Sequence, residues 1–439
     1  MVPDQRPVLI AIGYNTYGTG LTRVMHELLR PLATRYDVHF LGIGYKGPYL
    51  DDGIKWYPTN ENGGDVFAQF QAEELIQKLQ PELVFVVQDL WMFEQYMRCF
   101  KPYLDKIRLV AYIPLDGNIS DPSLVEPLLD AHAVVAYTSW AEHQFQQAFA
   151  TYPDKKSPTL HVVNHATDIH KFRPDEELLA AAFHPAGRTS ARRKVFEQAM
   201  MLRSGSRSRG FADSAYLAPD FLDRVTSGFL VLNGARPSER KRIDITIEGF
   251  ARFATGKPDV FLCLHHSFSN EATVREIEVL GKRFGIADQV LFNPLNPEGN
   301  AVTDEQLNQL YNACDVGVNT SMGEGWGLVN FEHAATGAAQ IVPDHSACGE
   351  LWQECGVLLG AGQAHIPRFS LLEMSQVDPA DLAQSLDKLY GDREFLQQLS
   401  NKAYRQVTRM AQFTWRQASE QFSRVFDECV NASPERVEA

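Results

Sequence analysis

Two carboxylates flank a glycine-rich turn in the stretch Thr-Ser-Met-Gly-Glu-Gly-Trp-Gly-Leu-Val-Asn-Phe-Glu, which covers residues 320–332. Glu324 lies in the turn, and Glu332 follows it with seven residues between them. The apolar residues after the turn have helical spacing, so the turn leads into the N-terminus of a helix. Such an end attracts an anion, because its first N–H groups are unpaired and the helix dipole is positive there. Carboxylates do not bind phosphates, so these two suit the hydroxyl groups of a sugar or a ribose.

Cationic side chains follow a second apolar run, residues 229–233, which we expect to be a buried strand. The loop after it reads Gly-Ala-Arg-Pro-Ser-Glu-Arg-Lys-Arg and is followed by an amphipathic helix. Arg236 offers a bidentate guanidinium and Lys241 a compact point charge. A strand that ends in fixed Arg and Lys side chains therefore predicts a pyrophosphate site.

Together the two stretches resemble the retaining glycosyltransferases of family 4, which have the GT-B fold and a Glu-x7-Glu signature. The resemblance implies that Glu324 faces the donor sugar and that Glu332 binds the ribose of the nucleotide. It implies that Arg236 and Lys241 match an Arg-x4-Lys pair that holds the leaving group. It also implies that the diphosphate is approached by the backbone of Gly325, Trp326, Gly327 and Leu328. The match is nearly continuous over residues 229–351.

The N-terminal half alternates strands and helices in the way of a doubly wound parallel sheet. Its first predicted strand, residues 8–12, leads into a loop that contains Gly18 and Gly20. This loop lacks the third glycine of a nicotinamide-type fingerprint, and the chain has no Walker-type Gly-Lys-Ser/Thr sequence. The family resemblance implies that Gly18 and Gly20 lie near the donor phosphate and the acceptor.

Two further residues follow predicted strands of this half. Asp116 lies beyond the carboxyl end of the strand predicted at residues 107–113, where ligands bind in such sheets. Many family members place a His near this position, so Asp116 either binds a sugar hydroxyl in its place or caps a turn. His165 lies in a segment that resembles the end of the family's N-terminal domain, and we expect it to pack between the domains rather than act as a general base.

The fold class that we expect is α/β, with two Rossmann-like doubly wound domains facing a cleft. Residues 1–170 form the acceptor domain, which is completed by a C-terminal helix within residues 412–439 that crosses back to it. Residues 227–411 form the nucleotide-sugar donor domain. Between them, residues 171–226 are expected to be an inserted basic or linker segment.

The inserted segment reverses the sign of the chain's charge. Residues 188–209 contain seven basic side chains and one acid, Glu197, in a protein with a formal net charge of −14. Three interpretations remain open: a solvated surface helix with a flexible loop, a membrane or anionic-acceptor contact running from Arg188 to Arg209, and a contact with nucleic-acid phosphates. We favour the first, and we place membrane contact above nucleic acid.

Bulk composition is ordinary for a globular protein, with 44% hydrophobic and 22% charged residues among 439. The acidic balance disfavours generic binding to nucleic acid or an anionic bilayer. No secretory signal and no apolar run of membrane-spanning length occur, and the scattered cysteines fit reduced thiols. We therefore expect a cytoplasmic protein, with peripheral contact to the inner face of the membrane left open.

The function that we expect is a retaining transfer of a hexose from a UDP- or GDP-sugar. The acceptor is a hydroxyl group of a glycan, a glycolipid or a small molecule. No Asp-x-Asp occurs, so we expect no metal and no cofactor. The alternatives are a sugar-nucleotide-binding protein without turnover, a phosphorylase- or epimerase-type enzyme, and a glycosyltransferase that uses residues 188–209 on membranes or nucleic acid.

Overall fold

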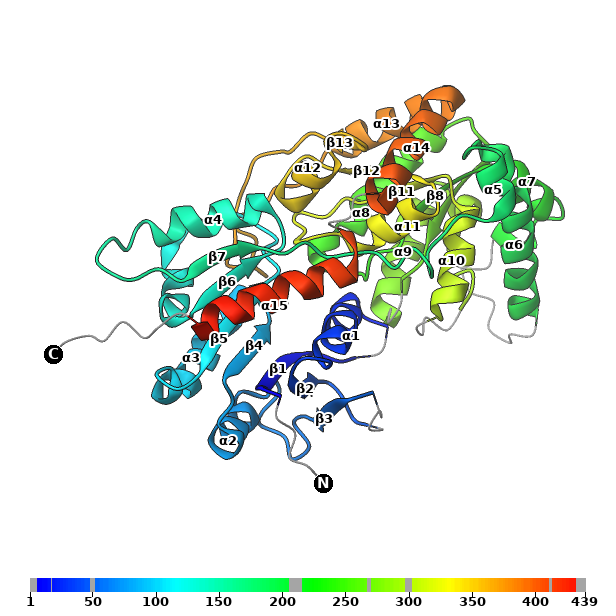
Figure 1. Cartoon of the computed structure of the whole chain (residues 1–439). Coiled ribbons are helices and arrows are strands. Elements are labelled where there is room, and N and C mark those ends of the chain that lie inside the picture. The colour runs from blue at the N-terminus through cyan, green and yellow to red at the C-terminus, as the bar shows by residue number, and fades with distance from the viewer. Residues whose placement is uncertain are drawn as a thin grey trace. The chain divides into compact units, whose positions relative to one another are not determined.

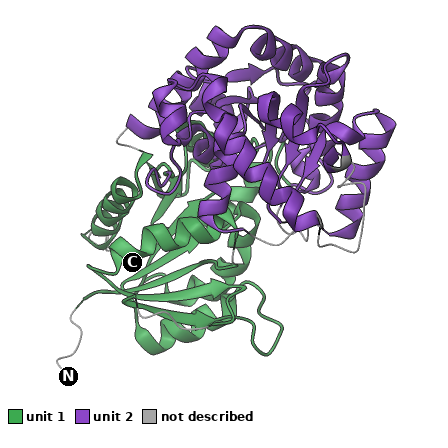
Figure 2. Ribbon diagram, turned by 90° about the vertical axis from the view of Figure 1, so that its right-hand side faces the viewer, with its two compact units in different colours: residues 1–166, 371–373, 412–439 green, residues 167–370, 374–411 purple. Residues whose placement is uncertain are grey.

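A computed structural model describes residues 6–16, 18–47, 52–204, 215–266, 270–296, 302–409 and 413–431. The chain divides into two compact units (Figure 2). Unit 1 comprises residues 1–166, 371–373 and 412–439, and unit 2 comprises residues 167–370 and 374–411. The segment 171–226, expected to lie apart from both domains, is included in unit 2.

Unit 1 is built on a parallel sheet of seven strands in the order β3-β2-β1-β4-β5-β6-β7 among the described residues. These strands are β1 (Val8–Tyr14), β2 (Asp37–Ile43), β3 (Ile54–Pro58), β4 (Leu83–Val87), β5 (Arg108–Ile113), β6 (Ala133–Ala136) and β7 (Thr159–Val162). The central strands are almost entirely buried apolar runs, as expected for a parallel sheet covered on both faces. The order of the strands reverses between β1 and β4, which makes this the topological switch point of unit 1.

The helices of unit 1 are α1 (Gly20–Leu32), α2 (Gln69–Leu79), α3 (Phe93–Phe100), α4 (Ser139–Phe149) and α15 (Trp415–Asn431). The C-terminal helix α15 lies against the sheet of this unit (Figure 1). Its Phe422 ring packs on Phe85 of β4 with centroids 4.9 Å apart, and its Asp427 accepts a hydrogen bond of 3.1 Å from Arg35. The prediction that the terminal helix completes the N-terminal domain is confirmed.

Unit 2 has a parallel sheet of six strands in the order β10-β9-β8-β11-β12-β13 among the described residues. They are β8 (Phe229–Asn233), β9 (Val260–Leu264), β10 (Val290–Phe292), β11 (Val316–Val318), β12 (Ala339–Pro343) and β13 (Val357–Leu359). The switch point of this sheet lies between β8 and β11. The two glutamates and the two cations identified in the sequence follow these two strands.

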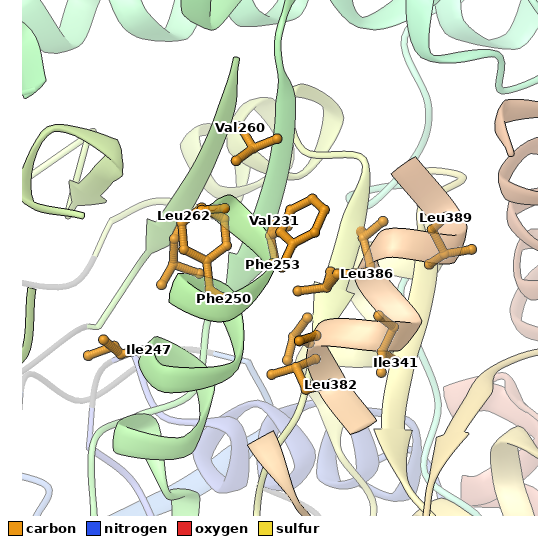
Figure 3. Packing of buried hydrophobic residues seen from close by; sticks show 14 of the residues in the cluster. Val231, Ile247, Phe250, Phe253, Val260, Leu262, Ile341, Leu382, Leu386 and Leu389 are labelled. Atoms are coloured by element: carbon orange, nitrogen blue, oxygen red, sulfur yellow. The ribbon is translucent and has the colours of Figure 1, made fainter. Parts of the chain in front are cut away.

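The helices of unit 2 are α5 (Glu176–Ala180), α6 (Thr189–Ser204), α7 (Phe221–Ser227), α8 (Ile243–Ala254), α9 (Glu271–Arg283), α10 (Asp304–Ala313), α11 (Leu328–Ala335), α12 (Ser346–Trp352), α13 (Pro379–Gly391) and α14 (Arg393–Arg409). Phe250 and Phe253 of α8 pack with Leu386 of α13 over the sheet (Figure 3). Gly249 allows this approach, since a Cβ there would lie 2.7 Å from the Leu382 side chain. Burying one such side chain contributes about 1.5–3 kcal/mol, so this core fixes the sheet that carries the site.

Candidate functional site

The candidate site of unit 2 lies where the loops after β8 and β11 meet. Lys241 ends a short 3-10 turn, η7 (Glu239–Lys241), in the loop after β8, and Glu324 lies in the glycine-rich turn after β11. Because β8 and β11 are hydrogen-bonded neighbours at the switch point, their loops open at the same edge of the sheet. The structure thus brings Lys241 and Glu324 together, and the donor-site role of both stays a prediction.

The Glu324 carboxylate is buried and accepts hydrogen bonds from four side chains. Its Oε1 accepts hydrogen bonds from the Lys241 ammonium, from Asn319 Nδ2 at 3.0 Å and from Ser321 Oγ at 2.8 Å. The guanidinium of Arg240 reaches its Oε2 at 3.4 Å. Only 6% of Glu324 is exposed, so these contacts hold a fixed negative charge inside the unit.

Electrostatics favour the charged form of Glu324 despite its burial. Burial of the carboxyl raises its pKa, but the charges of Lys241 and Arg240 and the hydrogen bonds from Lys241 and Asn319 outweigh burial and lower it to about 2. Burial lowers the pKa of the Lys241 ammonium, and the attraction of Glu324 offsets this only in part. The carboxylate, with two cations and several neutral donors, is therefore the better stabilised charge of the pair.

Arg240 is a site residue that the sequence analysis did not single out. Besides Glu324, its guanidinium donates to the backbone carbonyl of Gly323, so it contacts the turn at two points. Arg236, expected to hold the leaving group with Lys241, is an exposed residue of the loop after β8, and its role stays a prediction. Direct adjacency to Lys241 was the sequence feature that could have identified Arg240.

Buried hydroxyl groups fix the backbone that carries Lys241. Thr320 Oγ1 donates to the carbonyl oxygens of Lys241 and Arg242 at 3.1 and 2.9 Å. It also lies 2.7 Å from Thr246 Oγ1, which accepts a hydrogen bond from Asn233. The two loops of the site are thereby joined through their backbones as well as through the ion pair.

The start of helix α11 has the geometry that suits an anion. Its N-cap residue is Gly327, whose φ of 90° is in the left-handed region that favours glycine. No side chain caps the first turn, which begins at Leu328. Gly234 approaches this turn closely, because a Cβ there would lie 3.0 Å from Val329. The helix end therefore faces the cationic loop.

The remaining residues of the turn are inside the unit. Gly325 and Trp326 are buried, and the Trp326 ring stacks on Phe331 with centroids 4.6 Å apart. Glu332, in the second turn of α11, is 3% exposed and accepts a hydrogen bond of 3.2 Å from the Tyr311 hydroxyl. The Trp326 side chain is thus a packing element, and any role of this residue toward a ligand belongs to its backbone.

A chain of buried amides lies behind Glu324. Asn319 Nδ2 bonds both Glu324 and Asn330 Oδ1, each at 3.0 Å, and Asn330 Nδ2 donates to Gln340 Oε1 at 2.9 Å. Gly317 of β11 makes room for this chain, since a Cβ there would lie 2.2 Å from Gln340 Oε1. These residues were not predicted, because isolated Asn and Gln side chains carry no local pattern.

Three expected site residues, Asp116, Gly18 and Gly20, lie in unit 1. Asp116 is half-buried in the loop after β5, Gly18 has a φ of 78° in the loop after β1, and Gly20 begins α1. All three follow strands at the carboxyl edge of the unit 1 sheet. The role predicted for each of them toward a donor or an acceptor stays a prediction.

His165 has the structural role that we expected, but within unit 1. Its ring packs against Tyr137 with centroids 3.9 Å apart and against Trp415 at 5.8 Å. Burial lowers the pKa of the imidazole to about 3. A histidine in this environment is neutral at physiological pH.

Two arginines of the basic segment are internal to unit 2, which corrects the expectation of a wholly solvated helix, whereas membrane contact stays a prediction. Arg188 and Arg192 are 1% and 2% exposed. Arg192 pairs with Asp315 at 2.6 Å and donates to the carbonyl oxygens of Ala313 and Gly228. Arg188 donates to the carbonyl oxygens of Asn312 and Gly337 at 3.0 and 2.6 Å. Cations here satisfy carbonyl groups at the ends of α7, α10 and α11.

The apolar face of this segment is also buried. Val195, Phe196 and Ala199 are 0% exposed, and α6 packs on α7 and α10. Arg203 donates to the carbonyl oxygen of Phe292 at 2.6 Å, whereas Arg193 remains exposed. Arg207 and Arg209 lie outside the described residues. The inner face of α6 is thus occupied by the protein itself, whereas Met201 and Leu202 remain exposed.

Among the described residues, no group of three or more His, Cys, Asp or Glu side chains could hold a metal ion. Within the described ranges, no helix is both long and apolar enough to cross a membrane.

Neither a protein-family model nor a curated protein matches the chain. Solved structures do match it. HepE of Anabaena, in complex with UDP and glucose, superposes with a TM-score of 0.65 at 15% identity, covering 96% of this chain and 100% of HepE. Sucrose-phosphate synthase of Thermosynechococcus elongatus gives a TM-score of 0.67 at 15% identity, covering 98% of this chain and 100% of the synthase.

A third match is the α,α-trehalose-6-phosphate synthase of Burkholderia multivorans, with a TM-score of 0.63 at 11% identity, covering 97% of each chain. Likeness at this level of identity establishes architecture rather than activity. The prediction of two Rossmann-like domains in the GT-B fold is confirmed by these matches together with the two parallel sheets.

Proposed function

We propose that the protein is a retaining glycosyltransferase that moves a hexose from a nucleoside-diphosphate sugar to a hydroxyl group of an acceptor. The observation that carries the proposal is the contact of Lys241 and Arg240 with Glu324 at the β8/β11 switch point. The α11 N-terminus, which no side chain caps, lies at the same edge. This set can neutralise a diphosphate and orient a sugar within one site.

The donor nucleotide competes with Glu324 for the same cations. A diphosphate carries more negative charge than a carboxylate, so it attracts Lys241, Arg240 and the exposed Arg236 more strongly. Once these cations turn to the diphosphate, the Glu324 carboxylate is available to accept a hydrogen bond from a donor-sugar hydroxyl. Glu332, eight positions further along, is proposed to accept from the ribose.

The transfer breaks the bond between the sugar C1 and the diphosphate oxygen, and the bonding electrons leave with that oxygen. The acceptor oxygen forms a new bond to C1 on the same face, and its proton goes to the departing diphosphate. Fixed cations and the positive end of α11 stabilise the charge that develops there, which is electrostatic preorganisation. We propose that this stabilisation needs no metal ion.

UDP and GDP donors both fit a site whose cations bind the diphosphate. HepE, which shares the fold, forms a complex with UDP-glucose, so UDP-glucose is the first donor to test. The acceptor is proposed to be a glycan, a glycolipid or a small-molecule hydroxyl. Transfer of the sugar to an acceptor distinguishes the proposed enzyme from a protein that only binds the nucleotide sugar.

The test is nucleotide release from UDP- and GDP-hexoses with a panel of glycan acceptors, in the presence of EDTA. We expect release of the nucleotide. The anomeric configuration of the product linkage, determined by NMR, should be the same as that of the donor sugar. An Arg236→Ala/Lys241→Ala double variant should lose transfer at least a hundredfold, whereas Arg252→Ala, on the surface of α8, should retain it. Full activity of the double variant refutes the assignment of the leaving-group cations.

A further inference from the structure

The Tyr311 hydroxyl contacts the carboxylate that the proposed function assigns to the ribose. Tyr311 lies in the last turn of α10, and its hydroxyl donates a hydrogen bond of 3.2 Å to Glu332 Oε2 on α11. Both residues are inside unit 2, with 1% of Tyr311 and 3% of Glu332 exposed. A hydrogen bond is electrostatically stronger in a protein interior than in water, so this contact fixes one oxygen of the carboxylate.

Two neighbouring rings pack against Tyr311 and fix the direction of its hydroxyl. The centroid of the Phe172 ring lies 5.7 Å from that of Tyr311, and the centroid of the His333 ring lies at 5.3 Å. His333 follows Glu332 on α11 and is itself held, because its Nε2 lies 3.3 Å from the carbonyl oxygen of Cys314. The Tyr311 side chain therefore has little freedom to turn its hydroxyl away from Glu332.

The buried Arg188 anchors the two helices that carry this pair. Its guanidinium donates to the carbonyl oxygen of Asn312, the residue after Tyr311, at 3.0 Å. It also donates to the carbonyl oxygen of Gly337, just beyond the end of α11, at 2.6 Å. One rigid cation thus links the backbones of α10 and α11, and this link keeps the spacing between Tyr311 and Glu332 fixed. A functional group is held precisely when its supporting groups are fixed in this way.

A fixed carboxylate is better suited to a ribose than a freely rotating one. A carboxylate offers about four lone-pair sites, so the bond from Tyr311 leaves acceptor capacity for the 2′- and 3′-hydroxyl groups. These two donors lie side by side on the sugar ring, and both can bond the same carboxylate only over a narrow range of its orientations. Orienting the carboxylate in advance reduces the entropy that is lost when the nucleotide binds.

We propose that Tyr311 is a positioning residue that sets the preference of the donor site for ribonucleotides. It acts through Glu332 and does not touch the nucleotide. This role rests on the proposed function, which assigns Glu332 to the ribose. It adds the group that orients this carboxylate, and it adds selectivity against nucleotides that lack the 2′- and 3′-hydroxyl groups.

A second tyrosine of unit 2 provides a matched control. The Tyr390 hydroxyl of α13 donates to the carboxylate of Asp259, and the hydroxyl oxygen lies 3.0 and 2.9 Å from the two acceptor atoms. Asp259 directly precedes β9, so this pair lies at the amino edge of the sheet, opposite the edge that carries Lys241 and Glu324. Tyr390→Phe and Tyr311→Phe remove the same chemical group, but only Tyr311→Phe removes it beside the proposed ribose acceptor.

The test is calorimetric titration of the full chain with UDP, with GDP and with their 2′,3′-dideoxy analogues. The wild type should bind its ribonucleotide about tenfold or more tightly than the matching analogue, because the site contains an acceptor for the missing hydroxyl groups. Tyr311→Phe should bind the ribonucleotide about fivefold more weakly and the analogue as the wild type does. Tyr390→Phe should match the wild type with both ligands.

The ratio of the two affinities separates positioning from a purely structural role. Both ligands meet the same folded molecules, so a lower melting temperature of Tyr311→Phe does not change the ratio. A double-mutant cycle adds a second readout. Tyr311→Phe/Glu332→Gln should bind the ribonucleotide no more weakly than Glu332→Gln alone, because a residue that acts through Glu332 loses its effect when the carboxylate is removed.

Three outcomes overturn the role of Tyr311 and leave the diphosphate site standing. The wild type binds the ribonucleotide and its analogue equally, Tyr311→Phe weakens both ligands by the same factor, or Tyr311→Phe binds the ribonucleotide as the wild type does. Absence of binding by all four nucleotides contradicts the proposed function itself, so the two failures are distinguishable.

Discussion

The Lys241 ammonium donates a hydrogen bond to the Glu324 carboxylate, so the cation expected to hold a diphosphate and the carboxylate expected to face a sugar are paired with each other. Both side chains are largely buried, with 15% and 8% of their surfaces exposed. Breaking a buried pair on one side leaves an uncompensated charge, whereas neutralising both sides does not. This asymmetry gives the first prediction.

Lys241→Met should lower the free energy of unfolding by about 1–3 kcal/mol. This is less than the loss expected when a buried carboxylate loses its only partner, because Glu324 keeps its contacts with Arg240, Asn319 and Ser321. Adding Glu324→Gln should recover most of that loss without recovering transfer. Urea unfolding and nucleotide-release assays on the two variants measure both effects. A double variant no more stable than Lys241→Met would show that the charges are not coupled.

Asn319→Ala removes the amide that joins Glu324 to Asn330. It should destabilise unit 2 by about 1–3 kcal/mol, because the Glu324 carboxylate, the Asn330 amide and the Ser321 N–H each lose a buried partner. It should also reduce kcat more than it changes KM for the donor, since the carboxylate becomes less well oriented. Asn401→Ala, whose amide bonds the carbonyl of Ala182 at 3.1 Å, is the control. Equal effects of both variants on kcat would contradict a positioning role.

The buried Arg192 and the exposed Arg193 of α6 should contribute very differently to stability. Arg192→Met leaves the buried Asp315 with a longer contact to Arg188 at 3.8 Å and should cost about 3–5 kcal/mol. Arg193→Ala, on the exposed side of the same helix, should change stability by less than about 0.5 kcal/mol. Chemical denaturation compares them. Similar small effects would show that the segment is solvated after all.

Buried histidines should make unit 2 sensitive to mild acid. Burial lowers the pKa of His265 to about 4 and of His266 to about 3. As the pH falls below the ordinary value of about 6.5, the unfolded chain binds protons that the folded chain excludes, so stability decreases until the folded pKa is reached. Each group contributes at most about 1.4 kcal/mol per pH unit.

His265→Gln should therefore flatten the loss of stability between pH 6 and pH 4, which urea titrations across that range can detect. An unchanged slope in His265→Gln would mean that the imidazole is charged in the folded protein.

Glu324 acts in a lower pH window. Its stabilising charge is present above about pH 4.5 and is lost as the pH falls toward about 2.

Gly327→Ala tests the start of α11. An alanine at a φ of 90° costs about 1–2 kcal/mol, and its Cβ would lie 3.4 Å from Asn330 Oδ1. We expect lower stability and weaker UDP binding. Gly391→Ala is the control, because its Cβ would meet nothing within 4 Å and its φ is not positive. It should be neutral or slightly stabilising by thermal melting.

The central strands and the glycine-rich turn of the candidate site were predictable from the sequence, because both depend on local residue patterns. Apolar runs such as residues 83–87 coincide with β4, and the glycine-rich turn before Glu332 leads into α11 as expected. The edge strands β3 and β13 were not predicted. Lys55 interrupts the apolar run of β3, and β13 has only three residues, so pairing with a neighbouring strand decides their place.

Partners that lie far along the chain account for what the sequence could not show. Arg188 and Arg192 look like solvated charges locally, yet their partners are carbonyl groups and Asp315 more than a hundred residues away. The contact of Arg240 with Glu324 likewise depends on how the loop turns, with Arg242 at a φ of 47°. Neither relationship has a signature in residue type or spacing.

Calorimetric titration of UDP into the wild-type chain and into Arg240→Ala/Lys241→Ala, with EDTA present, tests the central claim most directly. We predict that wild type binds one UDP per chain, and that the double variant binds at least a hundredfold more weakly, equivalent to about 2.7 kcal/mol. Arg252→Ala should match the wild type. UDP binding that survives the loss of both cations, or the absence of binding by UDP and GDP alike, would contradict a diphosphate site at Lys241 and Glu324.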